Sequence, residues 1–224
     1  MTRVKIAATA DVHSPRFLDT FESALMDCEE PNLFLFAGDM INRGKSDEYS
    51  KILDIMDTQI GSHFPIVACF GNEEPLECRV DINRITSGRI AFLDGNFQVF
   101  TLADLNFAVV GISGINMEQL ELGSRTIDEI KFLFKNRAIQ LSSLLQVASQ
   151  VSEHLILLMH YSPLNEDNPS EFSWWVSKAT EDVQPDLIIH GHVHDSNRIE
   201  SKIGATTVRN VALPTTGMIT QMYL

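Results

Sequence analysis

The sequence contains seven residues whose side chains commonly bind metal ions, and each lies at or near the end of an apolar run. Two aspartates, one asparagine and four histidines make up the set, namely Asp11, His13, Asp39, Asn72, His160, His192 and His194. Imidazole combined with carboxylate suits Mn²⁺, Fe, Co²⁺ or Zn²⁺ better than Mg²⁺, which prefers oxygen ligands and water. If the fold gathers these residues, the chemistry that they could support is that of a transition-metal centre.

Each of these residues also has an ordinary structural explanation when it is considered alone. Asp11 could cap a turn, and His160 at a strand end could be a core histidine with satisfied hydrogen bonds. Asp39 and Asn72 each follow a glycine, which is a common turn sequence. The segment GHVH at 191–194 is a stronger signal, because alternate residues of an extended strand point the same way and could share a site. The whole set, placed at strand ends in one chain, is hard to explain by turns.

The elements that would position these residues follow from the alternation of apolar runs and amphipathic stretches. Predicted strands cover residues 4–10, 32–38, 65–72, 89–93, 154–160 and 186–192. Predicted helices cover residues 15–28, 46–60 and 124–152. Ser46 is expected to cap the second helix. Residues 97–114 predict a hairpin that turns near 104–106, and residues 198–224 predict further antiparallel strands.

This order of elements predicts an α/β fold. Strands and helices alternate in the first half, which implies parallel β-α-β units, and the hairpins add antiparallel strands. We therefore expect a four-layer α/β/β/α sandwich with mixed sheets and helices outside. A length of 224 residues is most simply one domain, covering residues 1–224. Functional residues of open α/β sheets gather at the carboxyl ends of the strands, which is where the seven residues are expected.

The composition is that of a soluble globular protein, with 44% apolar and 21% charged residues. No apolar run reaches the roughly 18 residues of a membrane span, and the first apolar stretch is too short for a signal peptide. The cysteines are Cys28, Cys69 and Cys78, an odd number without CxxC spacing. A disulfide framework is therefore not expected, and the sequence predicts a cytoplasmic protein without membrane association.

The net charge of −13 argues against non-specific binding of nucleic acids or anionic membranes, since such binding needs a basic face. It does not argue against phosphate chemistry. An acidic protein can still bind phosphate locally if cations are held in the site.

In order, the motifs D-x-H, GD, GN, H and G-H-x-H resemble those of the calcineurin-like metallophosphoesterase superfamily. The resemblance runs from Asp11 to His194, nearly the whole chain. It implies a dinuclear metal site, in which Asp39 bridges the two ions. The remaining positions divide into a first set, Asp11, His13 and His194, and a second set, Asn72, His160 and His192.

The resemblance implies a metal-dependent phosphoester hydrolase, in which two divalent ions activate a hydroxide for in-line attack on phosphorus. Manganese is the expected metal, with iron, cobalt, nickel and zinc as alternatives. The expected partner is a small phosphoester substrate, with a nucleotide-derived compound as one candidate, and the oligomeric state stays open. The superfamily also includes a scaffold subunit of retromer with a degraded metal site. That alternative, a non-catalytic interaction module, predicts missing ligands, and none is missing here.

Glu73 departs from the family pattern, because a histidine follows Gly-Asn in much of the superfamily and assists the leaving group there. Members of similar size without this histidine resemble phosphodiesterases, so we expect a phosphodiesterase, with a phosphomonoesterase as the alternative. Glu73 could replace the histidine only if protonated, which requires a pKa raised by burial or by a neighbouring carboxylate. Otherwise it would turn away and cap the following helix. We expect Asp39, His192 and Glu73 to take part in catalysis.

Two further features have open roles. GDMINRG at 38–44 resembles the GDxxDRG motif of protein phosphatases, so Arg43 could contact substrate phosphate or could be a surface turn residue. Trp174 and Trp175 end the segment 162–175, which is the best candidate for a variable loop over the site. They could stack on a nucleobase, or they could pack a helix against the core.

Overall fold

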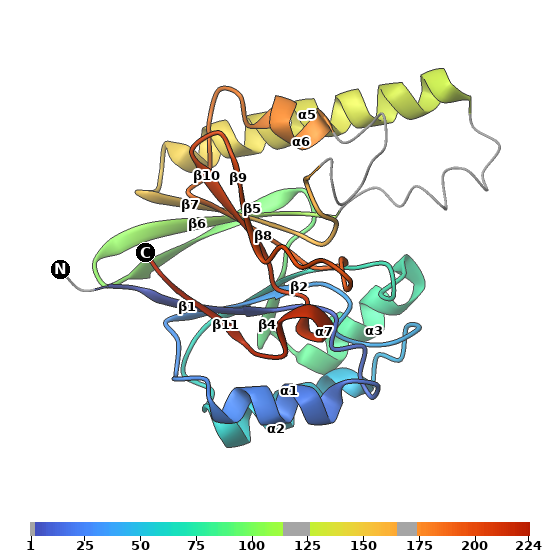
Figure 1. The fold of residues 1–224 in the computed structure, drawn as a ribbon, viewed down its shortest axis with the longest axis vertical. Helices are drawn as coiled ribbons and strands as arrows, with labels where there is room; N and C mark the ends of the chain where they lie inside the picture. Colours follow the sequence, from blue (N-terminus) through green and yellow to red (C-terminus); the bar gives the residue numbers. More distant parts are fainter. Residues whose placement is uncertain (1–2, 114–125, 165–173) are drawn as a thin grey trace.

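The computed structural model describes residues 3–113, 126–164 and 174–224 (Figure 1). Its first sheet consists of β1 (Lys5–Thr9), β2 (Leu33–Ala37), β3 (Ile66–Cys69), β4 (Ile90–Phe92) and β11 (Thr220–Tyr223). The strand order is β11-β1-β2-β3-β4. Strands β1 to β4 are parallel, and β11 pairs antiparallel with β1. The carboxyl ends of four neighbouring strands therefore meet at one edge of this sheet.

The second sheet is also mixed. It consists of β5 (Asn96–Leu102), β6 (Leu105–Ile112), β7 (His154–Met159), β8 (Leu187–His190), β9 (Glu200–Ile203) and β10 (Thr206–Asn210). The strand order is β5-β6-β7-β8-β10-β9. The four central strands are parallel, and the two edge strands are antiparallel to their neighbours.

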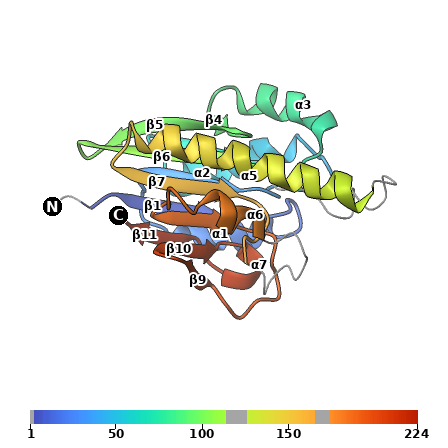
Figure 2. The ribbon, with the colours of Figure 1, turned by 90° about the horizontal axis from the view of Figure 1, so that it is seen from above.

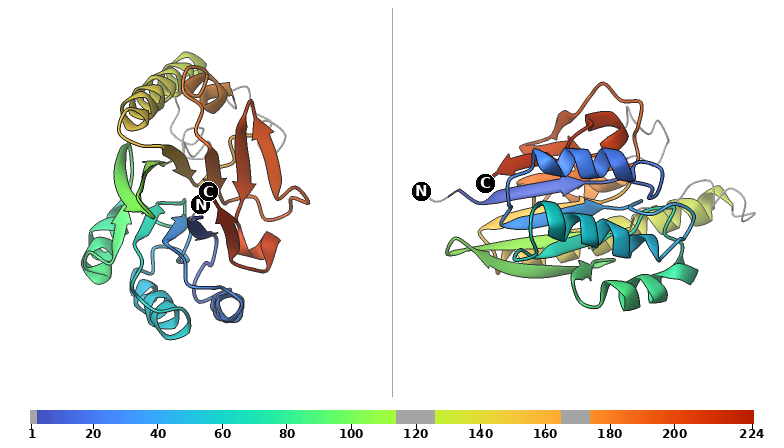
Figure 3. Two further views of the ribbon diagram at one scale, coloured as in Figure 1. Left: turned by 90° about the vertical axis from the view of Figure 1, so that its left-hand side faces the viewer. Right: turned by 90° about the horizontal axis from the view of Figure 1, so that it is seen from below.

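Helices cover the outer faces of both sheets (Figures 1 and 3). On the first sheet lie α1 (Leu18–Met26), α2 (Glu48–Gln59) and α3 (Leu76–Thr86). On the second sheet lie α5 (Ile127–Ser149) and α6 (Trp174–Ala179), and α5 crosses β5, β6 and β7 (Figure 2). The short helix α7 (Leu213–Thr216) precedes β11. This arrangement confirms the predicted α/β/β/α sandwich with mixed sheets.

Burial on both faces explains why the inner strands appear in the sequence as continuous apolar runs. In β2, Leu33 and Leu35 pack between the two sheets, whereas Phe34 and Phe36 pack under α1 and α2. The strand β7 shows the same alternation, with one set of side chains between the sheets and the other beneath α5. Successive side chains of a strand point to opposite faces, so a strand in the middle of four layers needs apolar residues at every position.

Several local features differ from the sequence-based expectations. The predicted Ser46 cap is wrong, because α2 begins at Glu48 with Asp47 at the N-cap position and no side-chain cap. The hairpin turn lies at Ala103 and Asp104, which both have positive φ, so β6 begins earlier than predicted. The long helix α5 instead has a complete capping box between Thr126 and Glu129. No helix of the described part is both long and apolar enough to cross a bilayer.

Candidate metal centre

The seven residues with metal-binding side chains all follow the carboxyl ends of five parallel strands, β1, β2, β3, β7 and β8. Four of them, Asp11, His13, Asp39 and His192, have positive φ values between 44° and 69°. Residues other than glycine seldom adopt this conformation, and such strain is concentrated at functional sites. The backbone at these strand ends therefore adopts a strained conformation that directs these side chains into the site.

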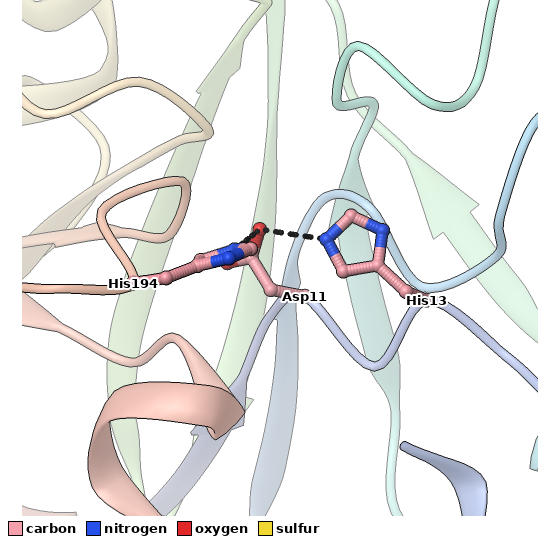
Figure 4. Close-up of side chains that lie close together, drawn as sticks. All are labelled: Asp11, His13 and His194. Carbon is pink, nitrogen blue, oxygen red and sulfur yellow. Dashed lines mark hydrogen bonds and ion pairs between the residues drawn. The ribbon is translucent and has the colours of Figure 1, made fainter. Parts of the chain in front are cut away.

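Three of the residues form a first cluster. Each of Asp11, His13 and His194 offers a ligand atom, and these atoms lie within 4.8 Å of one another. Figure 4 shows the Asp11 carboxylate between the two imidazole rings. Its Oδ1 lies 3.0 Å from Nε2 of His194 and 3.6 Å from Nε2 of His13. The His13 Nε2 atom is buried without a hydrogen-bond partner among the described residues, so it is aimed at the cluster but not satisfied within it.

Four residues form a second cluster around Nε2 of His160. This atom lies 3.1 Å from Asn72 Oδ1, 3.2 Å from His192 Nδ1 and 3.3 Å from Asp39 Oδ2. His160 Nδ1 lies 2.8 Å from the carbonyl oxygen of Ala37, to which it can donate its proton. In the neutral ring that bond leaves the Nε2 lone pair directed into the cluster, as is typical of a metal-binding histidine.

Asp39 lies between the two clusters. Its Oδ2 is 3.3 Å from His160 Nε2 in the second cluster and 3.9 Å from His13 Nε2 in the first. Its Oδ1 accepts a hydrogen bond from the backbone N–H of Glu73 at 2.7 Å. One carboxylate oxygen is thus fixed by the backbone, and the other faces ligand atoms of both clusters.

The spacing of these atoms fits metal coordination. Ligand atoms about 2.1 Å from an ion lie about 3.0 Å apart in octahedral geometry and about 3.4 Å apart in tetrahedral geometry. The separations of 3.1, 3.2 and 3.3 Å around His160 match these values, as does the 3.0 Å between His194 and Asp11. Nitrogen ligands from histidine together with carboxylate oxygens favour a transition metal over Mg²⁺. The residues present therefore fit two divalent transition-metal ions.

Electrostatic coupling among the side chains of the two clusters is strong. Burial would raise the pKa of Asp11, but its attraction to the neighbouring imidazoles of His13 and His194 outweighs burial, so this pKa lies well below its ordinary value. Burial would lower the pKa of His160, but the charge on Asp39 outweighs it and raises this pKa to about 9. Desolvation, followed by the charge on His160, lowers the pKa of His192 to about 4. The Asp11 carboxylate is therefore ionised and ready to bind a cation.

The geometry corrects the argument made from GHVH. The strand β8 ends at His190, so His192 and His194 lie beyond it, and the φ of His192 is 69°. Their side chains belong to different clusters. The extended-strand alternation that predicted a shared site is therefore wrong, although both residues do reach the centre.

Glu74 is a residue that sequence reasoning missed. Its side chain is fully buried, and its two oxygens accept four hydrogen bonds. The donors are the backbone N–H groups of Asp39 (3.2 Å), Met40 (3.0 Å) and Gly71 (2.9 Å) and the hydroxyl of Tyr49 (2.6 Å). Burial, and then the charge on Asp39, raises its pKa. Glu74 thus joins the two loops that carry Asp39 and Asn72, and nothing in the sequence pattern separates it from its neighbour Glu73.

The Glu73 carboxylate makes a contact that the sequence did not predict. Its Oε2 accepts a hydrogen bond from the backbone N–H of Arg43 at 2.6 Å, and its carbonyl accepts one from Gly44 at 2.8 Å. The helix α3 has Pro75 at its N-cap position and no side-chain cap, so the predicted capping by Glu73 is wrong. The residue lies beside Asp39, and its carboxylate holds the loop 38–44.

The remaining candidates can also be placed. Arg43 is exposed on that loop, with a φ of 52°, and its side chain has no ion pair among the described residues. Trp175 is buried in the core beneath α5, as the packing interpretation predicted, and Trp174 lines a cavity between α5 and α6. Residues 165–173 of the predicted loop over the site lie outside the described part of the chain.

Comparisons with known proteins agree with this geometry. The sequence profile of the calcineurin-like phosphoesterases matches residues 4–196. TT1561 of Thermus thermophilus has a TM-score of 0.61 at 14% identity, over 99% of each chain. A 5′-nucleotidase precursor from the same organism has a TM-score of 0.54 at 13% identity, over 100% of this chain and 54% of that chain.

Plasmodium GAP50, described as the anchor in the inner membrane complex, has a TM-score of 0.58 at 14% identity. The match covers 96% of this chain and 73% of the GAP50 chain. No curated protein gives a significant match to the sequence. At these identities the solved structures show the shared fold alone.

Proposed function

The chain belongs to the calcineurin-like phosphoesterase family. We propose that it hydrolyses small phosphodiesters with two divalent transition-metal ions, and that manganese is the first candidate for these ions. The observation that carries this proposal is the position of Asp39 Oδ2, which faces ligand atoms of both clusters. When bound, the two ions would lower the pKa of a coordinated water and neutralise charge on the phosphoryl oxygens. The chain's own residues would perform the remaining steps.

These residues fall into two metal-binding sets and one bridging residue. Asp11, His13 and His194 would hold the first ion, and Asn72, His160 and His192 the second. Asp39 would bridge the ions through the oxygen that its backbone contact with Glu73 leaves unoccupied. The hydrogen bond between His160 Nδ1 and the Ala37 carbonyl would hold the ring in this orientation. His192 would additionally contact the phosphoryl group.

A non-catalytic anchor or scaffold is the alternative, and GAP50 shows that a protein described as an anchor has this fold. That role places no demand on metal ligands. Here all seven ligand-type residues lie in the described part of the chain, and together they form the two compact clusters. The completeness of both clusters favours the enzyme.

We infer the preference for diesters from Glu73, where the family commonly has histidine. A monoester is largely dianionic near pH 7, whereas a diester carries one negative charge. If the Glu73 carboxylate lies about 4–6 Å from the bound phosphoryl group, it repels the dianion more strongly, by about 1 kcal/mol or more in a partly desolvated site. No imidazole follows Asn72 to protonate a poor leaving group, so activated or cyclic diesters should be the better substrates.

The test compares kcat/KM for bis(4-nitrophenyl) phosphate and 4-nitrophenyl phosphate at fixed pH with Mn²⁺. The wild type should favour the diester, because its single charge is repelled less. Glu73→His should lower the diester-to-monoester ratio by about tenfold or more, since imidazole supplies a general acid. Metal content should not change.

Glu73→Gln is the matched control, because it removes the charge, keeps an acceptor for the Arg43 N–H and adds no imidazole. A wild type that favours the monoester would contradict the diester preference. A ratio that stays the same in Glu73→His would show that Glu73 serves only to hold the loop 38–44. Absence of hydrolysis of both esters by metal-loaded wild type would contradict the proposed function itself.

A further inference from the structure

A cavity opens beside the second cluster, at the carboxyl ends of β3, β6 and β7. Its volume is about 330 Å³, and its wall includes Asn72 and Tyr161. Asn72 Oδ1 lies 3.1 Å from His160 Nε2, and the Tyr161 ring lies 4.5 Å from that of His192 between centroids. A phosphoester held at the second cluster would therefore have one substituent at the mouth of this cavity. The volume falls within the range of small-molecule sites, about 300–1,000 Å³.

Two arginines in the wall are held in place by one carboxylate. Arg79 Nη1 lies 3.1 Å from Asp94 Oδ2, and Arg137 Nη2 lies 3.6 Å from Asp94 Oδ1. Arg137 also donates to the carbonyl of Ser113 at 2.8 Å. With Glu77, the charged lining residues are two cationic and two anionic. The charges cancel, so this cavity is not suited to a second phosphate or another strongly anionic group.

The wall has unused hydrogen-bonding capacity. Nε of Arg137 and Oγ of Ser113 are buried and find no hydrogen-bond partner among the described residues. Both oxygens of Asp94 in the same wall already accept a hydrogen bond, from Arg79 Nη1 and from the Ser113 N–H, but each carboxylate oxygen can accept a second, so donors and acceptors lie close together. A ligand that both donates and accepts hydrogen bonds would match this lining better than a purely apolar one.

One flat surface in the wall is rigid. The Phe70 ring stacks on Phe92, with centroids 4.6 Å apart and planes 6° apart. The Arg79 guanidinium carbon lies 4.2 Å from the centroid of Phe70. A guanidinium supported on one face by an aromatic ring can offer its other face to a planar ligand.

We propose that this cavity binds one substituent of the phosphodiester, and that the substituent is a nucleoside. A nucleobase is planar and uncharged, and its edge both donates and accepts hydrogen bonds, which matches the stacking surface, the charge balance and the polar lining. Arg79, Asp94 and Arg137 would then be specificity-determining residues. This inference rests on the proposed function, because it requires the phosphoryl group to lie at the metal centre.

The test uses two diesters that release the same 4-nitrophenolate, namely thymidine 5′-(4-nitrophenyl phosphate) and methyl 4-nitrophenyl phosphate. With Mn²⁺, the wild type should show a kcat/KM for the nucleoside ester at least about tenfold higher than for the methyl ester. Arg137→Gln and Asp94→Asn should each lower that ratio by about tenfold, as expected for loss of a charge-assisted hydrogen bond. Two variants are used so that a failure of one to fold does not decide the outcome.

Arg84→Gln is the matched control, because Arg84 is an exposed arginine of α3 that pairs only with Asp81 among the described residues and lies outside the cavity. It should keep the wild-type ratio. Equal rates for the two esters in wild type, or an unchanged ratio in both folded variants, would overturn the nucleoside site.

A second measurement separates this inference from the proposed function. If metal-loaded wild type hydrolyses neither ester, the proposed function fails. Isothermal titration calorimetry with thymidine then tests whether the cavity binds a nucleoside. Binding that Arg137→Gln weakens and Arg84→Gln does not would support the nucleoside site. Absence of thymidine binding would overturn it.

Discussion

Replacing Asp39 by asparagine should lower kcat/KM for an aryl phosphodiester by more than about 100-fold, beyond the 10–100-fold typical of residues that only support metal ligands. The carboxylate Oδ2 faces both clusters, at 3.3 Å from His160 Nε2 and 3.9 Å from His13 Nε2. An amide has the same size but no negative charge, so it bridges two cations poorly. The measurement is steady-state hydrolysis with Mn²⁺, with the metal content of each protein determined in parallel.

Arg43→Ala is the comparison for this prediction. Arg43 is exposed and contributes at most one contact to a substrate, so its loss should cost about tenfold or less. Equal losses in the two variants, or a greater loss in Arg43→Ala, would contradict the bridging role of Asp39.

Replacing Glu74 by alanine should destabilise the folded protein by about 3 kcal/mol or more. The change leaves the Tyr49 hydroxyl and three backbone N–H groups buried without their acceptor. Each unsatisfied buried donor costs about 1–3 kcal/mol, although some will find other partners or water. The measurement is the free energy of unfolding in urea, made on metal-free protein so that metal binding does not contribute.

Two variants serve as controls for the role of Glu74. Tyr49→Phe removes one donor and keeps the three backbone bonds, so its cost should be about 1 kcal/mol. Glu77→Ala changes a nearby exposed glutamate in the first turn of α3, and its stability should lie within about 0.5 kcal/mol of wild type. If Glu74→Ala were no more destabilising than Glu77→Ala, the four hydrogen bonds would not hold these loops together.

The sequence predicts the layers of this fold because burial on both faces leaves a continuous apolar run. The segment LFLFA of β2 has no polar residue at any position, and the structure buries it on both sides. Metal-binding residue types at the ends of such runs could therefore be assigned to the carboxyl ends of strands from the sequence alone. The α/β/β/α sandwich is confirmed for this reason.

Loop conformation could not be predicted in the same way. The positive φ of His192 sends it and His194 into different clusters, and apolar periodicity contains no information about such a turn. Glu73 and Glu74 are adjacent and chemically alike, yet one contacts a surface loop and the other is buried among four donors. That difference depends on contacts with residues 39–49, which lie far from them along the chain.

The central claim is that the chain holds two metal ions, and elemental analysis tests it most directly. Protein purified without chelator, loaded with Mn²⁺ and freed of excess metal should contain about two ions per chain, because ligands for both positions are present. A content near zero in protein that is folded by circular dichroism would contradict the account and would favour the scaffold role.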